Sequence, residues 1–150
     1  FMKLAEALQG RAALTRRIAQ LRSRLESNAL VQEGEKPAED PNELWQELLA
    51  CANRLEALMT QINLRNSQTL VEGQTLTALM AKRDCLRLKA DACRELAEQA
   101  SQLASRAAHT EIRILSAVDV RALQKQADGF AAELRRTDNL IQMTNWATEL

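Results

Sequence analysis

Apolar residues recur at alternating spacings of three and four positions along most of this chain, and this spacing is the strongest constraint on its fold. Such a period places the residues on one face of an α-helix. The first run comprises Leu4, Ala7, Arg11, Leu14, Ile18, Leu21, Leu25 and Asn28, and the second comprises Leu44, Leu48, Cys51, Leu55, Leu58 and Ile62. Two further runs begin at Leu76 and at Val120. The four runs predict helices over about residues 3–32, 42–63, 75–107 and 117–147.

The composition agrees with a mainly helical protein. Ala and Leu supply 49 of the 150 residues, whereas Val and Ile supply only nine and Gly only four. Ala and Leu are the best apolar helix formers, while β-sandwiches need β-branched residues and phosphate-binding α/β folds need glycine-rich loops. We therefore expect a single domain of long antiparallel helices, arranged as a four-helix, coiled-coil-like bundle.

The segments between the runs carry turn and capping residues. Asp40 and Pro41 fit an N-cap and the first position of a helix, and Ser116 with Asp119 has the spacing of a capping box. Around Glu72-Gly73, residues 69–76 have the pattern of a β-hairpin, although a plain loop fits nearly as well. Residues 110–115 alternate in part, which indicates a short strand or an extended link, and a strand there would pair with residues 69–76 in a small β-ribbon.

Catalytic and metal-binding motifs are scarce. The single histidine, His109, has no partner at a ligand spacing, and we expect no catalytic, cofactor-binding or metal site. The cysteines Cys51, Cys85 and Cys93 fit no zinc pattern and fall on apolar stripes, which predicts buried, reduced thiols. No secretion signal or apolar run of membrane-spanning length is present, so we expect a cytoplasmic protein without a membrane partner.

Charge is balanced over the whole chain but not along it. The 20 basic and 20 acidic residues cancel, so we expect no nucleic-acid partner. Residues 1–25 hold six basic residues and one acid, whereas residues 26–50 hold one basic residue and seven acids. Two neighbouring helices that attract each other, or that attract the helices of a symmetry-related copy, explain this pattern. The alternative is a basic surface for an anionic partner, formed by Arg11, Arg16, Arg17, Arg22 and Arg24.

Several polar residues occupy or adjoin the apolar stripes and form a candidate polar cluster, namely Arg11, Arg83, Asp84, Asp138, Gln142 and Asn145. A polar group in a core must be paired, so the cluster predicts either a layer that fixes helix register or an internal polar pocket. The only large aromatic anchors besides two phenylalanines are Trp45 and Trp146, which we expect at an interface.

The segment Ser116–Val120, followed by Leu123–Asp128, Arg135, Asp138, Ile141-Gln142 and Asn145-Trp146, resembles a septicolysin-like family of small bacterial helical proteins. The resemblance extends to the opening Met2–Leu8 and to the stretch Val31–Glu35. It implies a helical domain of unknown function, with no catalytic residues to transfer. The family label itself implies membrane activity.

Helices two to three times longer than the average of about 11–12 residues usually bury a second face against another subunit. The sequence therefore predicts a self-associating structural or interaction protein, a homo-oligomer with no evident catalytic activity and no cofactor. Two alternatives remain open. One is a membrane-active protein, and the other is a ligand-binding protein or enzyme with a polar pocket between the third and fourth helices.

Overall fold

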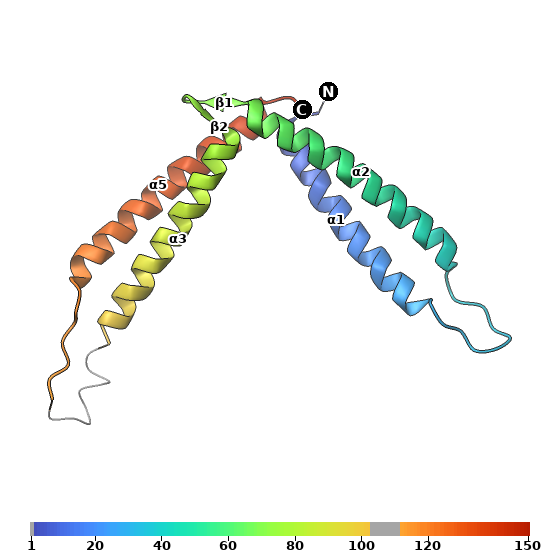
Figure 1. Cartoon of the computed structure of the whole chain (residues 1–150), viewed down its shortest axis with the longest axis horizontal. Coiled ribbons are helices and arrows are strands. Elements are labelled where there is room, and N and C mark those ends of the chain that lie inside the picture. The colour runs from blue at the N-terminus through green and yellow to red at the C-terminus, as the bar shows by residue number, and fades with distance from the viewer. Residues whose placement is uncertain (1, 103–111) are drawn as a thin grey trace. The chain divides into compact units, whose positions relative to one another are not determined.

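The structure, a computed structural model, describes residues 2–102 and 112–150. Within these ranges four helices and two short strands follow one another (Figure 1): α1 Leu4–Ser27, α2 Pro41–Gln68, β1 Leu70–Val71, β2 Gln74–Thr75, α3 Leu76–Ala100 and α5 Val120–Ala147. The predicted mainly helical fold with a small hairpin is confirmed. The chain forms two compact units, one of Phe1–Leu70 with Thr144–Leu150 and one of Val71–Met143. That these form a single domain stays a prediction.

Helix α1 ends at Ser27, five residues earlier than predicted, because Asn28 terminates it. The Asn28 side-chain amide donates to the Arg24 carbonyl at 2.8 Å, and its carbonyl oxygen accepts from the Glu39 backbone N–H at 3.0 Å. Helix α2 begins as predicted, with Pro41 at its first position and Asp40 accepting from the Asn42 N–H at 2.9 Å. These side chains define both ends of the connection between the two helices.

Three other helix boundaries differ from prediction. Helix α2 continues past the predicted end at Asn63 to Gln68, and the burial of Ile62 and Asn66 accounts for this extension. Helix α5 starts at Val120, since Asp119 rather than Ser116 caps it and accepts from the Ala122 N–H at 3.0 Å. Helix α3 ends at Ala100 with Ser101 as its C-cap, so the predicted third helix is wrong at residues 101 and 102, and its residues 103–107 lie outside the described residues.

The hairpin forms at the predicted position. Its turn residues have positive φ angles, 51° at Glu72 and 81° at Gly73, as a two-residue type I′ turn requires. The predicted pairing with residues 110–115 is wrong for 112–115, which form no strand, while 110 and 111 are not described. Ile112 is 77% exposed and Leu115 is 69% exposed, and Ile114 between them is only half-buried, so this segment buries little apolar surface that would favour strand pairing.

The first unit is built on the two predicted stripes of α1 and α2. Leu21, Leu44 and Cys51 are buried, and a ring of half-buried side chains packs on them, namely Leu14, Ile18, Leu25 and Leu48. The C-terminal residues close the other end of the helix pair. The Leu4 N–H donates to the Thr148 carbonyl at 2.8 Å, and the Leu150 N–H donates to the Met2 carbonyl at 2.9 Å.

In the second unit, α3 and α5 lie side by side (Figure 1). Small buried side chains, Ala90 and Ala97 on α3 and Ala127 on α5, leave room for two helices to approach closely. Charged residues connect the pair at its edges. Lys82 lies 3.2 Å from Glu133, and the Lys89 ammonium lies 5.8 Å from the centre of the Phe130 ring.

Candidate functional site

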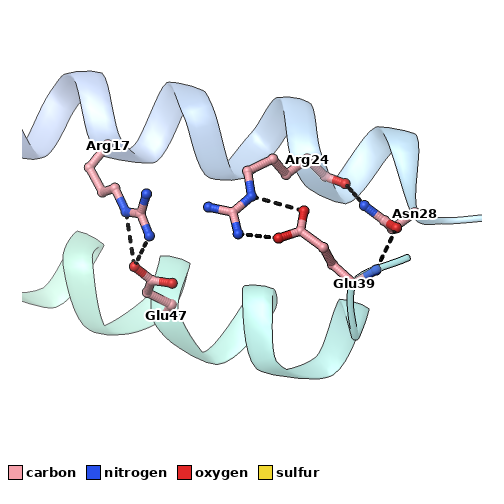
Figure 2. A network of polar contacts seen from close by, with 5 residues as sticks. All are labelled: Arg17, Arg24, Asn28, Glu39 and Glu47. Atoms are coloured by element: carbon pink, nitrogen blue, oxygen red, sulfur yellow. Dashed lines mark hydrogen bonds and ion pairs between the residues drawn. The ribbon is translucent and has the colours of Figure 1, made fainter. Parts of the chain in front are cut away.

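A polar network joins α1 to α2 and to the segment before α2 (Figure 2). The Arg17 Nε donates to Glu47 Oε1 at 2.9 Å. Two helical turns further on, the Arg24 guanidinium donates twice to the Glu39 carboxylate, once through Nε at 3.0 Å. Asn28 then holds the Glu39 backbone N–H, so the carboxylate faces Arg24 from a fixed position. A bidentate Arg–carboxylate pair specifies geometry as well as attraction.

This network accounts for part of the uneven charge of the first 50 residues, since it pairs two of their arginines with two of their glutamates. The Arg24 hydrogen bond lowers the pKa of the Glu39 carboxyl, and the Glu39 hydrogen bond raises the pKa of the Arg24 guanidinium. The acidic segment therefore lies against the basic helix, as the simpler interpretation predicted. Of the five arginines of the alternative basic surface, Arg17 and Arg24 bind partners inside the chain. The other three form no ion pair with a described residue, so that alternative stays a prediction for them.

A second apolar face runs along the α1–α2 pair, and we call it the outer face. We call the apolar run that each helix turns toward its partner the core stripe. On α2 the residues of the outer face each come one position after a residue of the core stripe, at Trp45, Leu49, Ala52 and Met59, with Glu56 between them. On α1 the same shift gives Leu8, Ala12, Thr15 and Ala19, and beyond them the charged residues Arg22 and Glu26. One residue turns a helix by about 100°. Because the helices are antiparallel and their core stripes face each other, the same shift turns both rows to the same side of the pair.

The outer face leaves large side chains in solvent. Trp45 is 49% exposed, Met59 is 42% exposed and Leu49 is 38% exposed. In the second unit, the positions that follow the α3 core stripe by one residue are mostly charged, including Asp84, Arg87, Asp91, Arg94 and Glu98. The positions that follow the core stripe by one residue are therefore apolar on most of α2 and mostly charged on α3.

Both tryptophans are accessible, as an interface role requires. Trp45 belongs to the outer face, and Trp146 is 52% exposed near the end of α5, in the first unit. Leu49 and Met59 were not identified as interface residues from the sequence. The signal that would have identified them is the second four-and-three spacing on α2, displaced by one residue from the core stripe.

The candidate polar cluster is only partly assembled. In the second unit Arg83 lies 3.2 Å from Asp84 and 3.8 Å from Asp138, so it bridges α3 and α5. Gln142 is exposed on α5 in the same unit. Arg11 is half-buried and Asn145 is 5% exposed, and both belong to the first unit. The role of the cluster stays a prediction.

The three cysteines differ in environment. Cys51 is buried, as predicted, and Cys93 is half-buried, but Cys85 is exposed. The prediction for Cys85 was wrong because it lies on the solvent side of α3, with Ala81 and Leu88, rather than on the core stripe. Among residues 2–102 and 112–150, no three His, Cys, Asp or Glu side chains gather in a way that would hold a metal ion. His109 lies outside those ranges.

The sequence predicts that no segment of the chain is long and apolar enough to span a membrane. Across the part of the chain that the structure describes, no helix combines the length and the apolar character needed to cross a membrane.

Comparison with known proteins identifies the family. Residues 11–150 match the family described as "Family of unknown function (DUF6847)", and the chain belongs to it. The chain is also similar to a solved structure described as the crystal structure of a functionally unknown conserved protein from Corynebacterium diphtheriae. The two share 40% sequence identity with a TM-score of 0.93, over 99% of this chain and 98% of that chain. No curated protein matches.

The predicted septicolysin-like resemblance is wrong, because the family match identifies a different family and nothing points to septicolysin. The short runs that carried the resemblance, such as Ser116–Val120, include helix-capping residues that many helical proteins share. The membrane-active alternative depended on that family label and loses its support with it.

Proposed function

We propose that this member of a family of unknown function is a self-associating interaction protein, and that a second copy of the chain packs on the outer face. The exposure of Trp45, Leu49 and Met59 on one face of a single helix is the observation that carries the proposal. Large apolar side chains clustered on a surface typically mark an interaction site, because covering them removes apolar area from water.

A second copy suits this face because the face is complementary to itself. The α2 row carries the bulky residues Trp45, Leu49 and Met59. The α1 row is small at Ala12, Thr15 and Ala19, and charged further on at Arg22 and Glu26. In a twofold-symmetric dimer each contact occurs twice, so the bulky row of one copy can pack on the small row of the other. Both helices also exceed 20 residues, which gives the rows several turns over which to pack.

The proposal assigns roles to polar residues as well. Arg83 and Asp138 would hold the α3–α5 pair in register through their contact at 3.8 Å, and Arg11 would border the outer face and disfavour alternative alignments. Trp146 would extend the contact surface of the first unit. The protein would act in the cytoplasm, through assembly rather than catalysis.

A pair of charge-introducing variants tests the proposal. Leu49→Glu places a carboxylate on the outer face, whereas Leu64→Glu places one elsewhere on α2, at a leucine that is 54% exposed. We expect Leu49→Glu to weaken self-association at least about tenfold, because burying an unpaired charge is costly, and Leu64→Glu to leave it unchanged. Sedimentation velocity over a concentration series measures both.

Circular dichroism of each variant verifies that the helices are retained. If a folded Leu49→Glu protein associates as strongly as the unmodified chain, the outer face is not the contact surface.

A further inference from the structure

The second unit contains a pocket of ≈ 370 Å³ between the β-hairpin, α3 and α5. Its lining includes Glu72 from the turn, Leu79 from α3, and Arg136, Thr137, Leu140 and Met143 from α5. The volume is within the usual range of small-molecule sites, about 300–1,000 Å³. Six of the nine lining residues are polar or charged, and Leu79, Leu140 and Met143 are the apolar ones. This pocket is distinct from the outer face, which belongs to the first unit.

Two opposite charges in this lining are uncommitted. Glu72 and Arg136 enter no ion pair and no side-chain hydrogen bond within the two described ranges. The neighbouring cation Lys82 is different, since it lies 3.2 Å from Glu133. A pocket with one free carboxylate and one free guanidinium is complementary to a ligand that carries both a cation and an anion.

Thr137 adds a buried hydroxyl to the same pocket. The residue is 3% exposed, yet its side chain makes no hydrogen bond with any other described residue. Helical Thr15 and Thr60 instead donate to the carbonyl four residues earlier, at 2.9 Å and 3.0 Å. No fully buried side-chain polar atom in the described part of the chain lacks a partner, so the Thr137 hydroxyl retains access to the pocket space.

The backbone conformation of Glu72 also indicates a role in ligand binding rather than in stability. With φ at 51°, it occupies a turn position where Gly, Asn or Asp is favoured and where longer side chains cost free energy. Residues held in sparsely populated conformations concentrate at ligand sites. Here the turn places Glu72 in the lining of the same pocket as Arg136.

We propose that this pocket binds a small zwitterion, an α-amino acid with an apolar side chain. Arg136 would bind the ligand carboxylate, whose planar oxygens match the guanidinium fork, and the Thr137 hydroxyl would donate a further hydrogen bond. Glu72 binds the ammonium group. Leu79, Leu140 and Met143 then pack against the ligand side chain.

The first test is a titration of the full-length, isotope-labelled chain with L-leucine, followed by NMR. We expect saturable shifts at backbone amides of residues 72–82 and 136–143. Two probes of matched shape each lack one charge: 4-methylpentanoate has no ammonium, and 3-methylbutylamine has no carboxylate. Each is expected to bind at least about tenfold more weakly than leucine, the usual effect of removing one charged hydrogen-bonded group.

Matched variants locate the site. Arg136→Gln is expected to weaken leucine binding at least about tenfold, while Arg135→Gln, an exposed neighbour outside the pocket lining, leaves it unchanged. The proposal is overturned if leucine, methionine and phenylalanine all leave these amides unshifted. It is equally overturned if 4-methylpentanoate binds as tightly as leucine, or if Arg135→Gln weakens binding as much as Arg136→Gln.

Discussion

Single polar residues set the geometry of the first unit. Asn28 accepts from the backbone of Glu39 and donates to the backbone of Arg24, while the side chains of Glu39 and Arg24 bind each other (Figure 2). Three residues thus form a closed ring that ends α1 and fixes the residue that precedes Asp40, the cap of α2. Exposed ion pairs alone contribute little stability, but a pair organised by a third residue loses less side-chain entropy.

The lowered pKa of Glu39 makes this ring sensitive to acid. The native state keeps Glu39 ionised to a lower pH than the unfolded chain does, so its stabilising contribution is present at neutral pH and is lost as the pH falls through the native pKa. We expect Glu39→Gln to be less stable than the unmodified chain at neutral pH, and the two to converge in acid. Urea unfolding across that pH range measures the difference.

Glu35→Gln is the matched control, because Glu35 lies in the same connection and its side chain enters no ion pair in the described residues. The ion pair would not have this role if the unmodified and Glu39→Gln proteins differed in free energy of unfolding by the same amount from neutral to strongly acidic pH.

At the scale of the elements, the helices followed from apolar spacing but their ends did not. The four stripes predicted from Leu4 to Ile141 are mostly buried or half-buried wherever they are described, because a face with period 3.6 can only be covered as a helix. The end of α1 depends on a contact between Asn28 and Glu39, eleven residues apart. Such a contact has no local signature, and the start of α5 was similarly assigned to Ser116 instead of Asp119.

Replacing a glycine by alanine is expected to change the stability of the protein in opposite directions at two positions in different elements. Gly73 needs a positive φ of 81° in the hairpin turn, so Gly73→Ala is expected to destabilise the protein by about 1 kcal/mol or more. Gly129 lies inside α5, where a methyl group on its Cα would meet open space, so Gly129→Ala is expected to stabilise by about 0.5–1 kcal/mol.

Thermal unfolding of both variants measures the two changes in stability. If Gly73→Ala is neutral, the hairpin turn does not require the left-handed backbone conformation. A destabilised Gly129→Ala protein would show that α5 is not a regular helix at that position.

At the scale of the molecule, the two units carry different surfaces. The outer face of the α1–α2 pair is apolar, while the equivalent positions of α3 are charged, and the pocket beside Arg136 belongs to the second unit. Trp45 was predicted as an interface residue because it is a large aromatic anchor. The joint lining of one pocket by Glu72 and Arg136 could not be predicted, since 64 residues separate them and neither belongs to a motif.

The central claim is that the chain associates with itself through the outer face, and the mass of the unmodified protein in solution tests it most directly. The chain has a mass of 16.8 kDa. Sedimentation equilibrium over a range of protein concentrations is expected to give a whole-number multiple of 16.8 kDa, with dissociation on dilution. A constant mass of 16.8 kDa at every concentration, including the highest, would contradict the account.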